Sequence, residues 1–122
     1  MTRYACCGLV AALVLLAPAA AEECQPGYTA VPVRVENASG GEVTASLRAA
    51  RGGNWRSLAV AAGGSGEVAP CLQMVLAVAS AEWEVADGSG TVLCAGSKLV
   101  SEGAAVTLLV EGADACTLKV AQ

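Results

Sequence analysis

Few residues of this chain have side chains suited to catalysis. The sequence contains no histidine, which excludes a Ser-His or Cys-His pair and the usual proton carrier at neutral pH. Two carboxylates could still support glycoside hydrolysis, and Glu82 and Glu84 share one strand face because side chains alternate. We interpret them as a solvated face flanking an inward Trp83. We therefore expect a protein that is not an enzyme and that uses no cofactor.

The cysteines indicate cross-links rather than a metal centre. Residues 1–21 are expected to be removed as a signal peptide, as argued below from their sequence. The cysteines that remain are Cys24, Cys71, Cys94 and Cys116. An even number in a small exported domain is typical of two disulfides. The chain lacks the CxxC pairs and histidines of a zinc or copper site. Three pairings are possible. Cys94 and Cys116 both lie in alternating apolar patterns near the C-terminus, which favours that pair and leaves Cys24 with Cys71.

The residues best suited to hold a ligand surround one turn. Guanidinium groups bind carboxylates and phosphates well, and the turn is flanked by Arg48, Arg51 and Arg56. In the strand expected here, the side chain of Trp55 lies on the opposite face from those of Leu58 and Val60. Trp55 is therefore exposed if Leu58 and Val60 belong to the core. An exposed Trp beside arginines suits contact with a sugar acid or a protein. The alternatives are ordinary surface charge and a Trp that covers the end of the core.

Two short motifs are better explained as turns than as sites. The sequence Asp-Gly-Ser-Gly at 87–90 offers one carboxylate, too few for a calcium loop, and it is a strong hairpin signal. Asn37, Ala38 and Ser39 match an N-glycosylation acceptor. That match is common by chance, and we expect a turn there.

The elements that position these residues are short segments in which apolar and polar side chains alternate, separated by glycine-containing turns. We expect strands at 29–36, 42–49, 55–60, 67–70, 73–79, 82–85, 91–97, 105–110 and 116–121. Pro32 cannot donate to a ladder, which indicates an edge or a strand start. The apolar 73–79 segment indicates a central strand. Strands at roughly ten-residue spacing predict an all-β fold, a single antiparallel β-sandwich (Ig-like or similar) of about seven to nine strands stapled by two disulfides.

The N-terminus predicts export. Residues 1–21 combine Arg3, a short apolar run at 9–17 and an Ala-rich end, which is typical of a secretory signal peptide cleaved near Ala21. Cys6 and Cys7 leave with it. We expect 22–122 to form a single domain, periplasmic or secreted, with no stable membrane insertion after the signal is removed.

The net charge of the chain argues against some classes of binding partner. Eleven acidic residues and, once Arg3 is set aside, six basic ones give the mature chain a net charge of −5. All of that surplus lies in 61–122. An acidic half argues against nucleic acid and against anionic membrane surfaces. We expect an envelope protein or a glycan as partner.

Two segments carry a resemblance to a known type of domain. They are VRVENASGG at 33–41 and EGAAVTLLV at 102–110, with Gly-Gly and Gly-Ser turns between them. This order is similar to small periplasmic β-sandwich domains, among them the non-enzymatic accessory subunit of bacterial alginate O-acetylation. The resemblance implies an accessory role in modifying or exporting a polysaccharide.

Together these features favour an exported, non-catalytic binding or accessory module of the cell envelope, associated with polysaccharide modification or export. Its expected contact patch is Trp55 with Arg48, Arg51 and Arg56. The alternative is a secreted protease inhibitor, since small disulfide-bonded β domains can present a rigid loop. Its candidate loops are the turns at 51–54 and 61–66.

Overall fold

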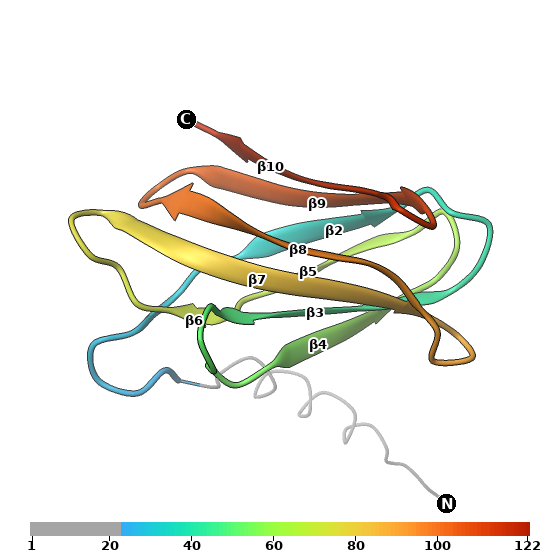
Figure 1. Cartoon of the computed structure of the whole chain (residues 1–122). Helices are drawn as coiled ribbons and strands as arrows, with labels where there is room; N and C mark the ends of the chain where they lie inside the picture. Colours follow the sequence, from blue (N-terminus) through green and yellow to red (C-terminus); the bar gives the residue numbers. More distant parts are fainter. Residues whose placement is uncertain (1–22) are drawn as a thin grey trace, which may run out of the picture.

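The computed structural model describes residues 23–122. The expected signal peptide at 1–21, including Cys6 and Cys7, lies outside the described residues. Within them the chain is all β, as predicted (Figure 1). Its ten strands are β1 (Thr29–Ala30), β2 (Val33–Asn37), β3 (Val43–Ala49), β4 (Arg56–Val60), β5 (Ser65–Val68), β6 (Cys71–Leu72), β7 (Val78–Asp87), β8 (Val92–Ser101), β9 (Ala105–Gly112) and β10 (Ala115–Ala121).

Two four-stranded sheets pack into a sandwich (Figure 1). Their strand orders are β10-β9-β2-β5 and β4-β3-β7-β8, and β1 pairs with β6 in a separate two-stranded sheet. Strand β4 lies beside β5 along one seam, and β8 lies beside β10 along the other. Alternation supplies the core, because every second side chain points inward. Fully buried members include Val35, Leu47, Val85, Leu108 and Val110.

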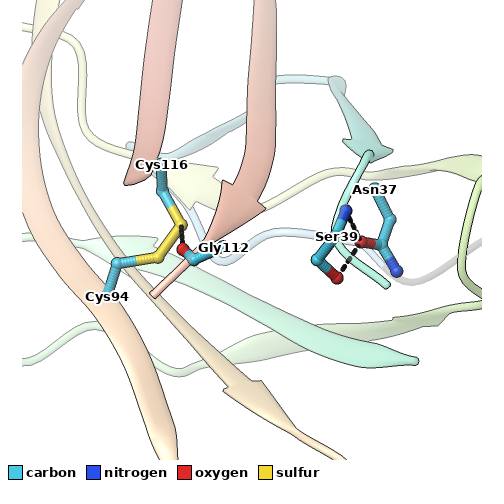
Figure 2. The surroundings of a disulfide bond; sticks show 5 residues. All are labelled: Asn37, Ser39, Cys94, Gly112 and Cys116. Atoms are coloured by element: carbon cyan, nitrogen blue, oxygen red, sulfur yellow. Dashed lines mark hydrogen bonds between the residues drawn. A yellow bond between two sulfur atoms is a disulfide. The ribbon is translucent and has the colours of Figure 1, made fainter. Parts of the chain in front are cut away.

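Both expected disulfides are confirmed. Cys24 bonds to Cys71, and Cys94 bonds to Cys116. The first bridge fastens the N-terminal arm to β6. The second joins β8 of one sheet to β10 of the other, close to Gly112 (Figure 2). Each bridge stabilises the fold by about 2–4 kcal/mol, and both are compatible with an oxidising compartment. No helix in residues 23–122 has the length and apolar character needed to cross a bilayer.

Trp83 points inward, as the alternation of its strand predicts. It is 8% exposed, and it lies directly opposite Gly96 in the β7–β8 register. A Cβ on Gly96 would lie 2.7 Å from Cζ2 of the indole ring. The missing side chain of Gly96 therefore makes the space that the indole ring fills.

The predicted central strand at 73–79 is wrong. Val75 and Val78 exchange backbone hydrogen bonds, and between them Leu76 and Ala77 have φ of 56° and 67°. Two residues with positive φ make a tight hairpin turn, and β7 begins only after it. Val75 is 64% exposed and Leu76 is 93% exposed. An apolar run indicates burial only on average, and here it forms an exposed tip.

One strand pair departs from the antiparallel expectation. Strand β2 runs parallel to β9, from Val33 opposite Val106 to Asn37 opposite Val110. Between β2 and β9 the chain forms β5, β6 and all four strands of the other sheet, and this long connection permits a parallel pairing. The segment expected at 29–36 is divided at Pro32, and β2 begins immediately after that residue. Pro32 therefore marks a strand start, one of the two positions predicted for it.

Candidate functional site

Trp55 and Arg48 form the centre of the candidate site. Trp55 is 40% exposed, and the guanidinium carbon of Arg48 lies 4.2 Å from the centroid of its ring. Arg48 Nε also donates a hydrogen bond to Glu82 Oε1 at 2.6 Å. The sheet register explains this contact, since Arg48 and Glu82 are directly opposite on β3 and β7. A cation–π contact and an ion pair thus hold Arg48 on the outer face of its sheet.

Arg56 lies elsewhere. It is opposite the buried Leu47 in the β3–β4 register, so its side chain leaves β4 on the inner side, toward the seam with β5. There its Nη1 donates to the carbonyl oxygen of Ala69 at 2.9 Å, and Nη2 lies 3.5 Å from the carbonyl oxygen of Glu23. Arg56 therefore ties the N-terminal arm to the seam between the sheets.

Arg51 occupies the turn between β3 and β4. It is exposed and has a φ of 69°. The structure therefore brings Trp55 and Arg48 together, leaves Arg51 at the turn and directs Arg56 to the seam. The sequence already indicated that Arg56 differs from the other two arginines. Its side chain lies on the same face of the strand as Leu58 and Val60, which were expected to be core.

Two depressions flank Trp55. The first, of about 720 Å³, is lined by Glu23, Gln25, Tyr28, Gly53, Asn54, Trp55, Arg56, Ser57, Glu67, Val68, Ala69 and Cys71. The second, of about 420 Å³, lies on the β4-β3-β7-β8 sheet and is lined by Arg48, Trp55, Glu82, Trp83, Glu84, Ala95, Gly96 and Ser97. Trp55 lines both, so it forms the ridge between them. Both volumes fall within the range of about 300–1,000 Å³ typical of ligand sites.

The charge facing these depressions is mainly carboxylate. The first is lined by two glutamates and one arginine, and the second by two glutamates and one arginine. Within residues 23–122 the ion pairs are Arg34–Glu36 and Arg48–Glu82. Three of the lining glutamates form no ion pair with any of these described residues: Glu23 and Glu67 in the first depression and Glu84 in the second. The arginine pattern in the sequence thus overstates the positive charge at this surface.

The other motifs form turns. Asp87 ends β7, and its carboxylate accepts hydrogen bonds from the Ser89 hydroxyl and from the backbone N–H groups of Ser89 and Thr91. These bonds, the Ser89 hydroxyl first, lower the pKa of Asp87. The predicted hairpin turn is confirmed. Among residues 23–122 no group of three or more Cys, Asp or Glu side chains is arranged to hold a metal ion.

The asparagine of the glycosylation-type motif is buried. Asn37 is 2% exposed, and its side-chain Nδ2 lies 2.8, 3.0 and 3.1 Å from the carbonyl oxygens of Gly41, Val60 and Ala61. Its Oδ1 accepts hydrogen bonds from the N–H and hydroxyl of Ser39 (Figure 2). The amide nitrogen that a glycan would need is thus enclosed by the fold.

Sequence reasoning missed the first depression. Its polar side chains come from the N-terminal arm, the β3–β4 turn, β4 and β5, and only tertiary structure brings these segments together. The Cys24–Cys71 pairing placed the arm near β6, but nothing in the sequence placed it beside Trp55. Comparison of the chain with protein-family models, with curated proteins and with solved structures finds no match.

Proposed function

We propose that this chain is an exported, non-catalytic binding module of the cell envelope that takes part in polysaccharide modification or export. The observation that supports this best is Trp55. A large aromatic side chain is left 40% exposed, although burying an apolar side chain of this size would stabilise the fold by about 1.5–3 kcal/mol. Exposed tryptophans held in position are frequent centres of binding surfaces.

The contacts of Arg48 support a preformed surface. Arg48 joins Trp55 on one side to Glu82 on the other, so the indole ring is held against the sheet before any ligand arrives. Preorganisation of this kind lowers the conformational cost of binding. The same ion pair engages Glu82, one of the two carboxylates that a hydrolytic mechanism would need.

The proposal is tested by crosslinking the mature protein in its native envelope fraction and identifying what is captured by mass spectrometry. We expect polysaccharide-modifying or polysaccharide-exporting proteins, or the glycan itself, and we expect Trp55→Ala to lose them. Leu99→Ala is the matched control, because Leu99 is another exposed apolar side chain, on β8 of the sheet whose strand β4 begins directly after Trp55. Capture that survives Trp55→Ala would refute this surface as the binding site.

Protease inhibition is the second candidate, and one observation favours it. Leu76 is 93% exposed at the tip of a tight turn, which makes it a better anchor than the expected turns at 51–54 and 61–66. Because Leu76 has a left-handed φ, inhibition would work by docking of the tip rather than by a substrate-like extended loop. Titration against leucine-preferring proteases tests this. Near-stoichiometric inhibition that Leu76→Ala abolishes would support it, and no inhibition would reject it.

A further inference from the structure

We infer that the surface around Trp55 binds a polysaccharide carrying free amino groups, such as a glucosamine-containing chain, rather than a polymer of sugar acids. This inference rests on the proposed function and names its ligand class. It follows from the way the fold distributes charge, hydrogen-bonding groups and the aromatic ring around Trp55.

The two arginines that line the depressions are already engaged, and Arg51, exposed at the β3–β4 turn, lines neither depression. Arg48 is bound to Glu82, and Arg56 donates to backbone carbonyl oxygens across the seam. Arg34, opposite Glu67 in the β2–β5 register, is bound to Glu36 and Ser65. A sugar carboxylate in either depression would therefore have to displace an existing partner to reach the guanidinium group that lines it. These contacts argue against an acidic polysaccharide.

The carboxylates are the groups left to bind a ligand. The lining residues of the two depressions include four glutamates and two arginines, a surplus of two carboxylates, and one of the four, Glu67, lies opposite Arg34 in the sheet register. Glu84 lies between Ser46 and Ala95 in the sheet register, with no cation opposite it. A protonated amine placed there would form a charge-assisted hydrogen bond, which is stronger than a neutral one.

The remaining lining suits sugar hydroxyl groups. Gln25, Asn54 and Ser57 in the first depression and Ser97 in the second provide neutral donors and acceptors. The Trp55 ring between them offers an apolar surface for the C–H face of a sugar ring. Because Trp55 lines both depressions, one chain could lie across the ridge and place successive sugar units on either side.

The same lining disfavours a basic peptide. Peptide recognition by a β-sheet uses a free strand edge together with pockets for alternate side chains. The depressions beside Trp55 are lined mainly by polar side chains, and Arg56 lies across the β4–β5 seam where an added strand would approach. A glycan needs neither an edge nor an apolar pocket.

The experiment measures binding of the mature, disulfide-bonded protein to four probes at about pH 6, where carboxylates are ionised and amines protonated. The probes are a glucosamine hexamer, its fully N-acetylated counterpart, an oligomannuronate and hexalysine. Tryptophan fluorescence reports on the site because Trp55 lines both depressions, and Trp55→Phe separates its signal from that of Trp83, which lines only the second. Calorimetry provides an independent affinity for each probe.

We expect the glucosamine hexamer to bind about tenfold or more tightly than the acetylated hexamer, with no binding of oligomannuronate. Glu84→Gln should weaken that binding by about three- to tenfold, and Trp55→Phe should remove the fluorescence change. Glu111→Gln is the matched control, because Glu111 is an exposed glutamate on β9 of the other sheet. It should leave the affinity unchanged.

Four results would overturn the inference. Equal binding of the two hexamers would assign the site to neutral glycans, and binding of oligomannuronate alone would assign it to acidic ones. Hexalysine binding as tight as the glucosamine hexamer would assign it to basic peptides. Binding of none of the probes would leave the site without this ligand class. The envelope crosslinking experiment decides the proposed function separately from each of these.

Discussion

Replacing Asn37 gives the sharpest test of how the two sheets are held together. Asn37 ends β2 in one sheet, and its amide donates to Val60 at the end of β4 in the other sheet and to Ala61 just beyond it. It also fixes the turn after β2 through Ser39 and Gly41. One buried side chain therefore links two sheets and a turn.

The magnitude follows from what each substitution leaves behind. Asn37→Ala removes all of these hydrogen bonds and leaves the Val60 carbonyl, which lies in buried surroundings, without its side-chain donor. An unsatisfied buried group costs about 1–3 kcal/mol, so we expect Asn37→Ala to lower the free energy of unfolding by about 2–4 kcal/mol. That is a large part of the roughly 5–15 kcal/mol typical of a domain.

Asn37→Asp is the more discriminating change. It keeps the acceptor for Ser39 but turns a carboxylate oxygen toward three carbonyl oxygens. At neutral pH the buried carboxylate has no positively charged partner, which costs more than an empty site. We therefore expect Asn37→Asp to be less stable than Asn37→Ala at pH 7. Burial raises the pKa of the new carboxyl, so the folded state binds more protons than the unfolded state, and the deficit should shrink as pH falls toward 4.

The assay is urea unfolding with the disulfides intact, followed by circular dichroism and by tryptophan fluorescence. Asn54→Asp is the control, because Asn54 is exposed and surface changes are usually within about 0.5 kcal/mol. A loss below about 1 kcal/mol for Asn37→Ala, or an Asn37→Asp deficit that does not change with pH, would refute the assigned role of this side chain.

Three further predictions concern local packing, charge and backbone conformation. Gly96→Ala should destabilise by about 1–3 kcal/mol, since its Cβ would lie 2.7 Å from the Trp83 ring, and thermal unfolding measures this. The pKa of Asp87 is lowered in the fold, chiefly by Ser89. Its stabilisation should be present above the unfolded pKa and disappear as pH falls through the folded pKa, and Asp87→Asn should remove that dependence in pH-dependent unfolding. Ala77→Gly should raise stability by up to about 1 kcal/mol, because Ala77 has a φ of 67°, and urea titration tests it.

Matched controls separate these effects from general damage. Gly88→Ala places a methyl group where no atom lies within 4 Å and where φ is not positive, so it should be close to neutral. If Gly96→Ala were equally neutral, the indole ring would not require the space at Gly96. Unchanged pH dependence in Asp87→Asn, or a loss of stability in Ala77→Gly, would contradict the corresponding assignments.

Local alternation let the sequence predict the parts of the fold that depend on neighbours along the chain. The pattern at 42–49 placed Val43, Ala45 and Leu47 inward, and the pattern around Trp83 did the same. Alternation reports which side chains share a face, because successive residues of a strand point in opposite directions. It also favoured the Cys94–Cys116 pair, whose strands each carry a cysteine on the apolar face.

Pairing between distant strands was decided only by the tertiary structure. The alternation of apolar and polar residues along a strand is the same in a parallel and an antiparallel pair. The sequence therefore did not predict the parallel pairing of β2 with β9. At 73–79 the side-chain types indicated burial, while the two backbone hydrogen bonds between Val75 and Val78 close a turn.

The candidate site divides in the same way. The sequence identified Trp55 and its arginines by residue type, and the register then placed Arg48 opposite Glu82 and Arg56 opposite Leu47. Two chemically identical side chains thus became a support for an exposed ring and a tie across a seam. The positions of the arginines along the chain placed guanidinium groups near this Trp. The carbonyl or carboxylate group that each arginine contacts belongs to strands far away in sequence. Those contacts are therefore determined only by the packing of the sandwich.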